Sequence, residues 1–398
     1  MKENKIFYTA TNREIKKGET TDVYFRRTKK ILEKKNISRR VIAEVTTGGF
    51  PRNWRWAVLC GIGEIANLFE NYPVDIDAIP EGKIFRARDV NGIRVPVMNI
   101  KGQYEKFCEL ETPLLGLICQ SSGIATSAAR IKKIAGKKQV ISFGVRRMHP
   151  AISPVIDRSA YIGGFDGVSC ILSAKKLGIK PMGTMPHALI IVMGDQTKAW
   201  LAFDEIIEKE VPRIALCDTF CDEKFEATMA AESIKNLSAV RLDTPGSRRG
   251  NLNDILREVR WELDIRNFRH VKLFVSGGID EDSLKKLINA PVDGFGVGTS
   301  ISNAPTIDFA MNIVEIDKKP VAKRGVFGGE KQAYRCPECY GCVVRLTYEE
   351  QPECKICGSE TEPLLKPLMR EGRLVAKLPS IQEIKKGVMN ELKKVDIE

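Results

Sequence analysis

Seven short apolar segments recur between residues 114 and 300, and each ends in polar or glycine-rich residues. Helix-like stretches separate them. This alternation is typical of repeated βα units, in which parallel strands form one sheet and helices cover it. The segments are QVISFG (139–144), GVSC (167–170), KPMGTM (180–185), RIALCD (213–218), SAVRLD (238–243), KLFVSG (272–277) and DGFGVG (293–298). We expect an irregular parallel α/β barrel, with functional residues at the carboxyl ends of its strands.

An open doubly wound sheet is the alternative arrangement of such units. A dinucleotide-binding sheet of that kind carries a G-x-G-x-x-G turn after its first strand. The sequence after residue 144 has no such turn. The barrel is therefore the favoured fold.

Five of the eleven cysteines fall close together near the C-terminus. Cys336 and Cys339 form one C-x2-C pair, and Cys354 and Cys357 form a second pair after fourteen intervening residues. Two such pairs can supply four thiolates to one structural Zn²⁺, and in a reducing compartment metal binding is favoured over disulfides. Cys342 lies close enough in sequence to substitute for Cys339.

The length of 398 residues favours two or three domains. Residues 1–113 combine a helical pattern at 56–70 with strand-like pieces and an Asn-Gly turn signal, which predicts an N-terminal α/β domain. Residues 114–325 form the predicted barrel. Residues 326–398 form a small zinc-knuckle domain followed by a helix, and part of this tail could pack with the N-terminal domain.

The composition is that of a globular protein, with 43% hydrophobic and 7% aromatic residues. No run of eighteen apolar residues and no N-terminal apolar segment occurs, so we expect a cytoplasmic protein without a membrane partner. The formal net charge is +12, and residues 1–40 hold thirteen Lys or Arg against five Asp or Glu. Such a segment suits a phosphate-rich ligand or nucleic acid, or is simply a solvated basic face.

Glycines follow the last two predicted strands. Gly277 and Gly278 precede one helix-like stretch, and Gly298 and Thr299 precede another. Glycines in such turns let backbone N–H groups approach a phosphate at a helix N-terminus. Two such turns on the final strands match the usual phosphate site of an α/β barrel.

Charged residues and one histidine end the middle strands. Arg241 and Asp243 precede a Pro-Gly break, Asp218 ends the strand before them, and His187 follows the segment 180–185. A carboxylate near a phosphate site can hold ribose hydroxyls or favour positive charge at an anomeric carbon. A salt bridge between Arg241 and Asp243 is the plainer interpretation, and the two can hold together.

These motifs, in this order, resemble those of the nicotinate phosphoribosyltransferases, a branch of the type II phosphoribosyltransferases. The matching motifs are ETPLLGLI, SFGVRR, SAYIGGFDGVSC, GTMPHALI, CDTF, RLDTPG, VSGGIDEDSL and DGFGVGTSI, and the cysteine pairs resemble those of archaeal members. The resemblance spans roughly residues 18–325. It implies an irregular α/β barrel with an N-terminal α/β domain, and active sites shared between subunits of a homodimer or of multiples of dimers.

The resemblance implies transfer of the phosphoribosyl group of phosphoribosyl pyrophosphate (PRPP) to nicotinate, which yields nicotinate mononucleotide and pyrophosphate in NAD salvage. Phe143 and the partner subunit's Tyr24 would stack on the two faces of the pyridine ring, while Arg241 and Ser169 would bind its carboxylate. Mg²⁺ would neutralise the pyrophosphate. The residues implied for PRPP are Arg146, Asp243, Gly277, Gly278, Gly298 and Thr299.

Ser169 bears on the choice of acceptor, because the related nicotinamide enzyme carries an acid at the matching position. A hydroxyl can donate to the carboxylate of nicotinate, whereas a carboxylate would repel it. His187 matches a histidine that ATP phosphorylates in the family, with Asp218 orienting it, so ATP becomes a possible co-substrate. The next residue is Ala188, where family members often have a small polar residue.

Two other functions remain open. Quinolinate phosphoribosyltransferase shares the barrel but binds a diacid, for which Arg147, Arg248 and Arg249 could supply cations. A nucleic-acid-binding protein would use the basic N-terminus and the zinc ribbon, but it needs aromatic residues among the basic ones, and residues 1–40 offer four. Nucleic acid is the less favoured partner, because its binding would not explain the polar and glycine-rich residues at the strand ends.

Overall fold

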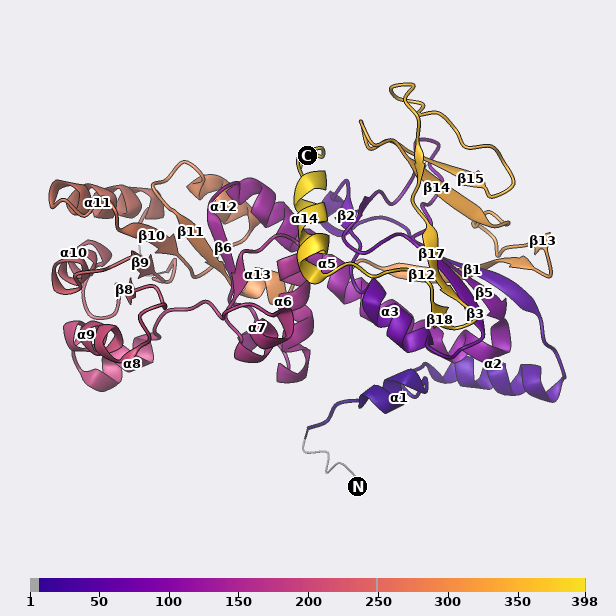
Figure 1. The fold of residues 1–398 in the computed structure, drawn as a ribbon, viewed down its shortest axis with the longest axis horizontal. Helices are drawn as coiled ribbons and strands as arrows, with labels where there is room; N and C mark the ends of the chain where they lie inside the picture. Colours follow the sequence, from indigo (N-terminus) through magenta and orange to yellow (C-terminus); the bar gives the residue numbers. More distant parts are fainter. Residues whose placement is uncertain (1–6, 248–249, 398) are drawn as a thin grey trace. The chain divides into compact units, whose positions relative to one another are not determined.

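The computed structural model describes residues 7–247 and 250–397, so Arg248 and Arg249 lie outside the described residues. The chain forms two compact units (Figure 1). One contains the residues up to 126 together with those from 305 on, and the other contains residues 127–304. Residues 114–126 and 305–325, which the sequence assigned to the barrel, thus belong to the first unit.

The first unit is built on a seven-stranded antiparallel sheet. Within this sheet, β1 pairs with β12 on one side and with β5 on the other. This pairing explains why residues after 305 leave the barrel, since β12 completes the N-terminal sheet. The strands, in spatial order, are β13 (Lys319–Pro320), β12 (Phe309–Ile316), β1 (Arg40–Thr47), β5 (Met98–Gln103), β3 (Val74–Ala78), β17 (Lys366–Arg370) and β18 (Arg373–Leu374).

Both faces of this sheet are covered, so β1 is buried at every position from Val41 to Thr47. Ala43 and Val45 point into an apolar core that α3 also supplies. The polar side chain of Glu44 is buried in an ion pair, in which its Oε2 lies 2.9 Å from Lys331 Nζ. The helices are α1 (Asn12–Lys16), α2 (Val23–Lys34), α3 (Ile62–Phe69), α4 (Tyr104–Phe107), α5 (Glu111–Ala135), which continues into the second unit, and α14 (Ile381–Glu391).

A three-stranded antiparallel sheet in the first unit carries the cysteine pairs. Its strands are β15 (Cys342–Leu346), β14 (Lys331–Arg335) and β16 (Glu362–Pro363), and a further pair joins β2 (Ala57–Val58) to β4 (Ile84–Phe85). Arg335 links this sheet to α14, because its guanidinium donates to both carboxylate oxygens of Glu391. The C-terminal tail therefore packs with the N-terminal residues of the same unit.

The second unit contains a six-stranded parallel sheet, which confirms the predicted parallel α/β class. The spatial order is β7 (Gly167–Val168), β6 (Gln139–Ser142), β11 (Gly294–Val297), β10 (Lys272–Val275), β9 (Ala239–Leu242) and β8 (Ile214–Leu216). The first strand lies beside the last, and the others follow in chain order. This is the order of a barrel opened between β7 and β8, and not that of a doubly wound sheet.

The opening lies where the sequence predicted a strand at 180–185, and that prediction is wrong. The segment forms no strand and keeps a single ladder-like bond, from the N–H of Met182 to the carbonyl of Val168 (2.8 Å). Pro181 and Pro186 have no N–H to donate, so a regular ladder cannot form there. The segment becomes a loop across the mouth of the half-barrel.

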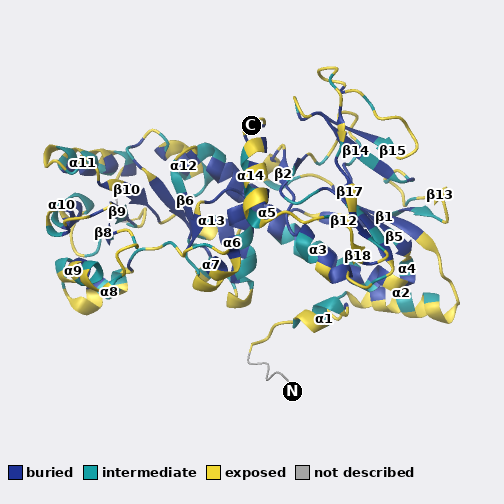
Figure 2. Ribbon diagram, viewed as in Figure 1, coloured by how far each residue is buried: buried dark blue, intermediate teal, exposed yellow. Residues whose placement is uncertain are grey.

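Helices cover the outer face of this sheet, and its strands are largely buried (Figures 1 and 2). The helices of the second unit are α6 (Ser153–Ile162), α7 (Ile171–Leu177), α8 (His187–Met193), α9 (Gln196–Ile206), α10 (Glu223–Ser233), α11 (Leu252–Ile265), α12 (Glu281–Leu287) and α13 (Thr299–Ser302), with 3₁₀ turns η3 (Val145–Arg147) and η4 (Pro150–Ile152). Within the described residues, no helix is long and apolar enough to cross a membrane.

Candidate active site

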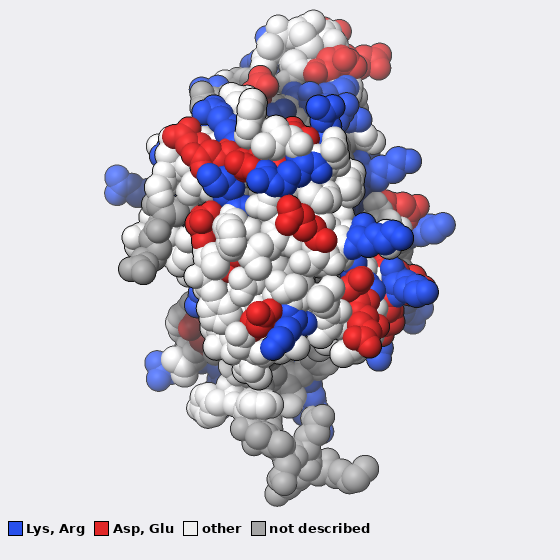
Figure 3. All heavy atoms as spheres, turned by 90° about the vertical axis from the view of Figure 1, so that its left-hand side faces the viewer, with Lys and Arg blue, Asp and Glu red and all other residues white. Residues whose placement is uncertain are grey.

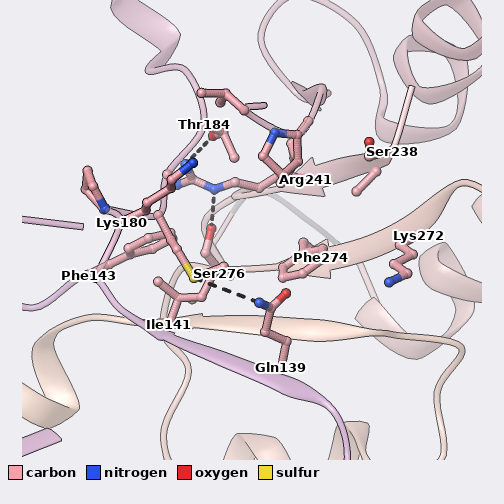
Figure 4. A pocket seen from close by; sticks show the side chains of 18 of the residues that line it. Gln139, Ile141, Phe143, Lys180, Thr184, Ser238, Arg241, Lys272, Phe274 and Ser276 are labelled. Carbon is pink, nitrogen blue, oxygen red and sulfur yellow. Dashed lines mark hydrogen bonds between the residues drawn. The ribbon is translucent and has the colours of Figure 1, made fainter. Parts of the chain in front are cut away.

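A cavity of about 410 Å³ opens inside the half-barrel (Figure 4). Successive strand residues point to opposite faces, so every second residue of β6, β9 and β10 lines it. Arg241 on β9 lines the cavity, and so do two residues that directly follow strands, Phe143 after β6 and Ser276 after β10. The volume falls within the usual range of small-molecule sites, about 300–1,000 Å³.

Glycines of β11 make room for the aromatic rings of this cavity. A Cβ atom on Gly296 would lie 2.3 Å from Cε2 of Phe143, and one on Gly294 would lie 2.3 Å from Cε1 of Phe274. Both distances are shorter than real Cβ contacts allow. Phe143 can therefore pack this closely against β11 only because residue 296 has no side chain.

Arg241 is held at the cavity wall by three polar neighbours. Its Nε donates to Ser276 Oγ (2.9 Å) and its Nη1 donates to Thr184 Oγ1 (3.0 Å), as the dashed lines in Figure 4 mark. Its Nη2 lies 3.2 Å from Asp243 Oδ2, which confirms the plain salt bridge. The guanidinium carbon lies 5.1 Å from the centroid of the Phe143 ring, so a cation and an aromatic face meet at one place.

Ser276 connects Arg241 to Asp243 a second time. Its hydroxyl accepts from Arg241 and donates to Asp243 Oδ1 (2.6 Å). Thr184 lies in the loop at 180–185, and Ser276 directly precedes Gly277. Neither residue was predicted from the sequence, although Thr184 stands in the motif GTMPHALI and Ser276 in the motif VSGGIDEDSL.

A buried carboxylate lies beside this network. Asp218 Oδ2 accepts from the N–H of Asp243 (2.6 Å) and from the hydroxyl of Thr244 (2.8 Å). Its Oδ1 is buried without a hydrogen-bond partner in the described structure and lies 3.6 Å from Nε2 of His187. Burial raises the pKa of Asp218, and the hydrogen bonds from Thr244 and Asp243 partly offset this.

His187 begins α8 and faces two carboxylates. Its Nε2 lies 3.6 Å from Asp218 Oδ1 and 3.8 Å from Asp243 Oδ2, while its Nδ1 lies 3.0 Å from Thr219 Oγ1. The structure thus brings His187, Asp218, Asp243 and Arg241 together. None of these distances involving a carboxylate is short enough for a hydrogen bond to the histidine.

The two glycine turns that are predicted to bind phosphate lie at the ends of the last two strands, β10 and β11. Gly277 and Gly278 adopt positive φ values of 82° and 71°, which favour glycine. A Cβ on Gly277 would also lie 3.1 Å from the carbonyl oxygen of Asp243. Ser300 Oγ donates to the carbonyl of Ile279 (2.8 Å) and so joins this turn to the one at Gly298 and Thr299. Phosphate binding there stays a prediction.

Three further predicted residues are not among those that line the cavity. The Ser169 hydroxyl donates to the carbonyl of Ser142 (3.0 Å) and does not line the cavity. Arg146 is exposed on η3. Tyr24 lies on α2 of the first unit, exposed, with its hydroxyl donating to Asp22 (3.0 Å). The structure leaves their predicted roles untested.

The four predicted cysteine ligands converge. The sulfur atoms of Cys336, Cys339, Cys354 and Cys357 all lie within 4.8 Å of one another. Four sulfurs bound to one Zn²⁺ at about 2.3 Å would be roughly 3.8 Å apart, and the pairs Cys336–Cys357 and Cys339–Cys354 lie at 3.5 and 3.4 Å. The cluster therefore fits one tetrahedral metal ion.

Cys342 is not part of this cluster, so its predicted substitution for Cys339 is wrong. It begins β15, pairs with Arg335 and is buried in the apolar core of the first unit. Gly341 precedes it, and a Cβ there would lie 3.3 and 3.4 Å from the sulfurs of Cys339 and Cys354. The chain turns at Gly341 directly beside the sulfurs and carries Cys342 away from them.

Three protein-family models match the chain. They are described as the quinolinate phosphoribosyl transferase N-terminal domain (residues 22–122), the C-terminal domain of the same enzyme (residues 124–312), and the nicotinate phosphoribosyltransferase C-terminal domain (residues 340–398). The nicotinate phosphoribosyltransferase pncB1 of Mycobacterium tuberculosis is 28% identical over 375 residues, which cover 86% of this chain and 83% of the relative.

Solved structures give the same relationship. A nicotinate-nucleotide pyrophosphorylase from Pyrococcus furiosus is 54% identical, with a TM-score of 0.94 and 98% of each chain covered. Human nicotinic acid phosphoribosyltransferase shares the fold, with a TM-score of 0.73, 20% identity and 94% of each chain covered. The chain therefore belongs to the nicotinate phosphoribosyltransferase family, a branch of the type II phosphoribosyltransferases.

Proposed function

We propose that the protein transfers the phosphoribosyl group of PRPP to nicotinate, and so makes nicotinate mononucleotide and pyrophosphate for NAD salvage. The observation that carries this proposal is Arg241, a cation held against the ring of Phe143 in a cavity of suitable size. An anionic aromatic acid can place its carboxylate on the guanidinium and its ring on the phenyl face. The printed names of the relatives agree with this substrate.

In this mechanism the ring nitrogen of nicotinate forms a bond to C1 of the ribose, and the bond from C1 to the pyrophosphate oxygen breaks. Positive charge builds on the sugar in the transition state. Asp243 lies next to Arg241 and would stabilise this charge and hold ribose hydroxyls. Gly277, Gly278, Gly298 and Thr299 would hold the 5′-phosphate, and Arg146 would assist with PRPP. Mg²⁺ arriving with PRPP would neutralise the leaving pyrophosphate.

Two further groups would complete acceptor binding. Ser169 would turn its hydroxyl from the carbonyl of Ser142 towards the carboxylate, and Tyr24 would cover the second face of the ring from the partner subunit in a homodimer. Tyr24 is 55% exposed, so its ring is accessible to such a neighbour. The apolar residues Ile191 and Val192 on α8, 58% and 85% exposed, follow His187 closely and would suit the same interface.

We further propose that ATP phosphorylates His187 and thereby assists PRPP binding. In support, His187 lies within 4 Å of two acidic side chains, Asp218 and Asp243, at the site proposed for PRPP. We also propose Zn²⁺ as the ion held by the four cysteines, in a structural role, since four thiolates leave no open position. All eleven cysteines lie in described residues and none forms a disulfide there, which fits a reducing compartment such as the cytoplasm.

Quinolinate is the second candidate acceptor. Two of the matched models are named for quinolinate phosphoribosyl transferase, and Lys180 supplies a second cation to the cavity that Arg241 lines. A diacid could use both cations. On the face that Figure 3 draws, positive and negative side chains lie interspersed, so this face offers no purely basic surface to nucleic acid.

The test is product formation. The protein is incubated with Mg²⁺ and PRPP and, in separate reactions, with nicotinate, nicotinamide or quinolinate, each with and without ATP. Chromatography then measures the mononucleotide. We expect product from nicotinate and a large loss in Asp243→Asn. Product from quinolinate, with release of carbon dioxide, would replace the proposal by the second candidate. No product from any acceptor would refute both.

A further inference from the structure

Three buried polar side chains lie behind the strand end that carries Phe143. Asp157 on α6 and Ser142 at the end of β6 are 0% exposed, and Ser173 on α7 is 1% exposed. In the described structure, both carboxylate oxygens of Asp157 and both serine hydroxyls lack a hydrogen bond of good geometry. Such atoms are rare in folded proteins, because each has lost the hydrogen bonds that water would make.

The serine hydroxyls lie beside the carboxyl group. Burial raises the pKa of Asp157, and hydrogen bonding to Ser142 and Ser173 partly offsets this rise. No cation takes part, although charged or titratable side chains occur on the elements around α6. Those on α6, η3, η4, α7 and the turn before β7 are Arg158, Arg146, Arg147, His149, Lys175, Lys176 and Asp166, and none contributes to the pKa of Asp157.

A buried carboxyl without a cation is more stable protonated than ionised. In the protonated form one oxygen donates and the other accepts. Ser142 and Ser173 can each donate or accept, so a neutral Asp157 can bond to both with small side-chain rotations. The cluster then joins β6, α6 and α7 without a buried charge.

Ser142 connects this cluster to the proposed acceptor site. Its carbonyl accepts from the N–H (3.2 Å) and the hydroxyl (3.0 Å) of Ser169, and the residue after it is Phe143. Ser173 lies in the first turn of α7, whose N-cap Cys170 directly follows Ser169. Asp157 therefore lies beside two residues that adjoin Ser169, namely Ser142 on the neighbouring strand and Ser173 in the helix that follows.

We propose that Asp157, as a neutral carboxylic acid, is a positioning residue that links Ser142 to Ser173 and thereby sets the positions of Ser169 and Phe143. It does not touch substrate in this arrangement. The consequence for acceptor choice rests on the proposed function, because it assumes that Ser169 meets the carboxylate of nicotinate. The expected effect on the backbone around Ser169 does not depend on the proposed function.

Three variants test this link. Asp157→Asn keeps the shape and can still donate and accept, whereas Asp157→Ala removes both capacities. Ser159→Ala is the matched control, because Ser159 is buried on the same helix and bonds within it, to the carbonyl of Val155 (2.8 Å). The KM for nicotinate, kcat and the preference for nicotinate over nicotinamide are measured for each.

We expect Asp157→Ala to raise the KM for nicotinate about tenfold and to lower the preference over nicotinamide by a similar factor, as the loss of one good hydrogen bond would. Asp157→Asn and Ser159→Ala should stay within about twofold of the wild type. Equal losses in Asp157→Asn and Asp157→Ala would mean that the carboxyl acts ionised, and an unchanged KM in Asp157→Ala would mean that it positions nothing. Either result overturns the proposal.

Amide hydrogen exchange separates this proposal from the proposed function, because it needs no turnover. Exchange at residues 169–174 should rise in Asp157→Ala and not in Asp157→Asn or Ser159→Ala. If exchange rises as expected but the wild type makes no mononucleotide, the proposed function fails and the positioning role stands. If the wild type is active but exchange in Asp157→Ala is unchanged, the positioning role fails alone.

Discussion

Thr184 and Ser276 both hold Arg241, but only Ser276 also contacts Asp243, and this difference gives a sharp prediction. Thr184→Val removes one hydrogen bond to the guanidinium, and Ser276→Ala removes one to the guanidinium and one to the carboxylate. If Arg241 binds the acceptor and Asp243 binds the ribose, Thr184→Val should weaken nicotinate binding alone. Ser276→Ala should weaken both nicotinate and PRPP.

The magnitude follows from the charge on one partner of each bond. A hydrogen bond to a charged group is worth about 1.5–3 kcal/mol, which corresponds to roughly 10- to 150-fold in an equilibrium constant. We expect the lower end, because Arg241 keeps its remaining partners in each variant. Thr184→Val should therefore raise the KM for nicotinate about tenfold and leave that for PRPP within about twofold.

Steady-state kinetics with each substrate varied in turn measures this split. Ser238→Ala is the matched control, since Ser238 lines the same cavity at the start of β9 but takes no part in the Arg241 network. Similar changes in both KM values for Thr184→Val would refute the division of roles between Arg241 and Asp243. So would a Ser276→Ala variant that changes neither.

Three other predictions concern ATP, metal and pH. His187→Ala should retain basal turnover and lose any ATP stimulation; stimulation that persists in the variant would exclude His187 as the phosphorylated group. Cys354→Ser or chelation should lower the melting temperature, and a loss of even about 3 kcal/mol would lower it by roughly 6–12 °C; an unchanged melting temperature, with no zinc found by elemental analysis, would show that the cluster holds none. Burial raises the pKa of Glu111 from 4.5 to about 7, so the folded state binds the proton more tightly than the unfolded state, and the contribution of Glu111 to stability falls as pH rises from about 4.5 to 7. Glu111→Gln should remove this fall in urea denaturation series, and an unchanged pH dependence would contradict it.

Several features of the fold follow from local sequence. Six of the seven predicted strands form, because each is a short apolar run followed by glycine or a polar residue. The helices predicted at 56–70 and near the C-terminus occur as α3 and α14. The cysteine ligands converge because the two C-x2-C pairs lie on loops of one small sheet, where spacing alone constrains them.

Other features depend on contacts that no local pattern encodes. The pairing of β12 with β1 joins residues 309–316 to residues 41–47, so the sequence placed β12 in the wrong unit. Thr184 and Ser276 meet Arg241 only because a prolyl loop and the end of β10 approach the same point of the half-barrel. Asp157 has no motif at all, and its isolation among buried hydroxyls is visible only in three dimensions.

Arg241 carries the central claim, that this half-barrel recognises an acidic pyridine through a guanidinium held against an aromatic ring. The most direct test is the ratio of kcat/KM for nicotinate to that for nicotinamide, in the wild type and in Arg241→Gln. The account predicts a large preference for nicotinate in the wild type that collapses towards unity in the variant, because the glutamine amide can bond to either acceptor but attracts no charge. A ratio that Arg241→Gln leaves unchanged would contradict it.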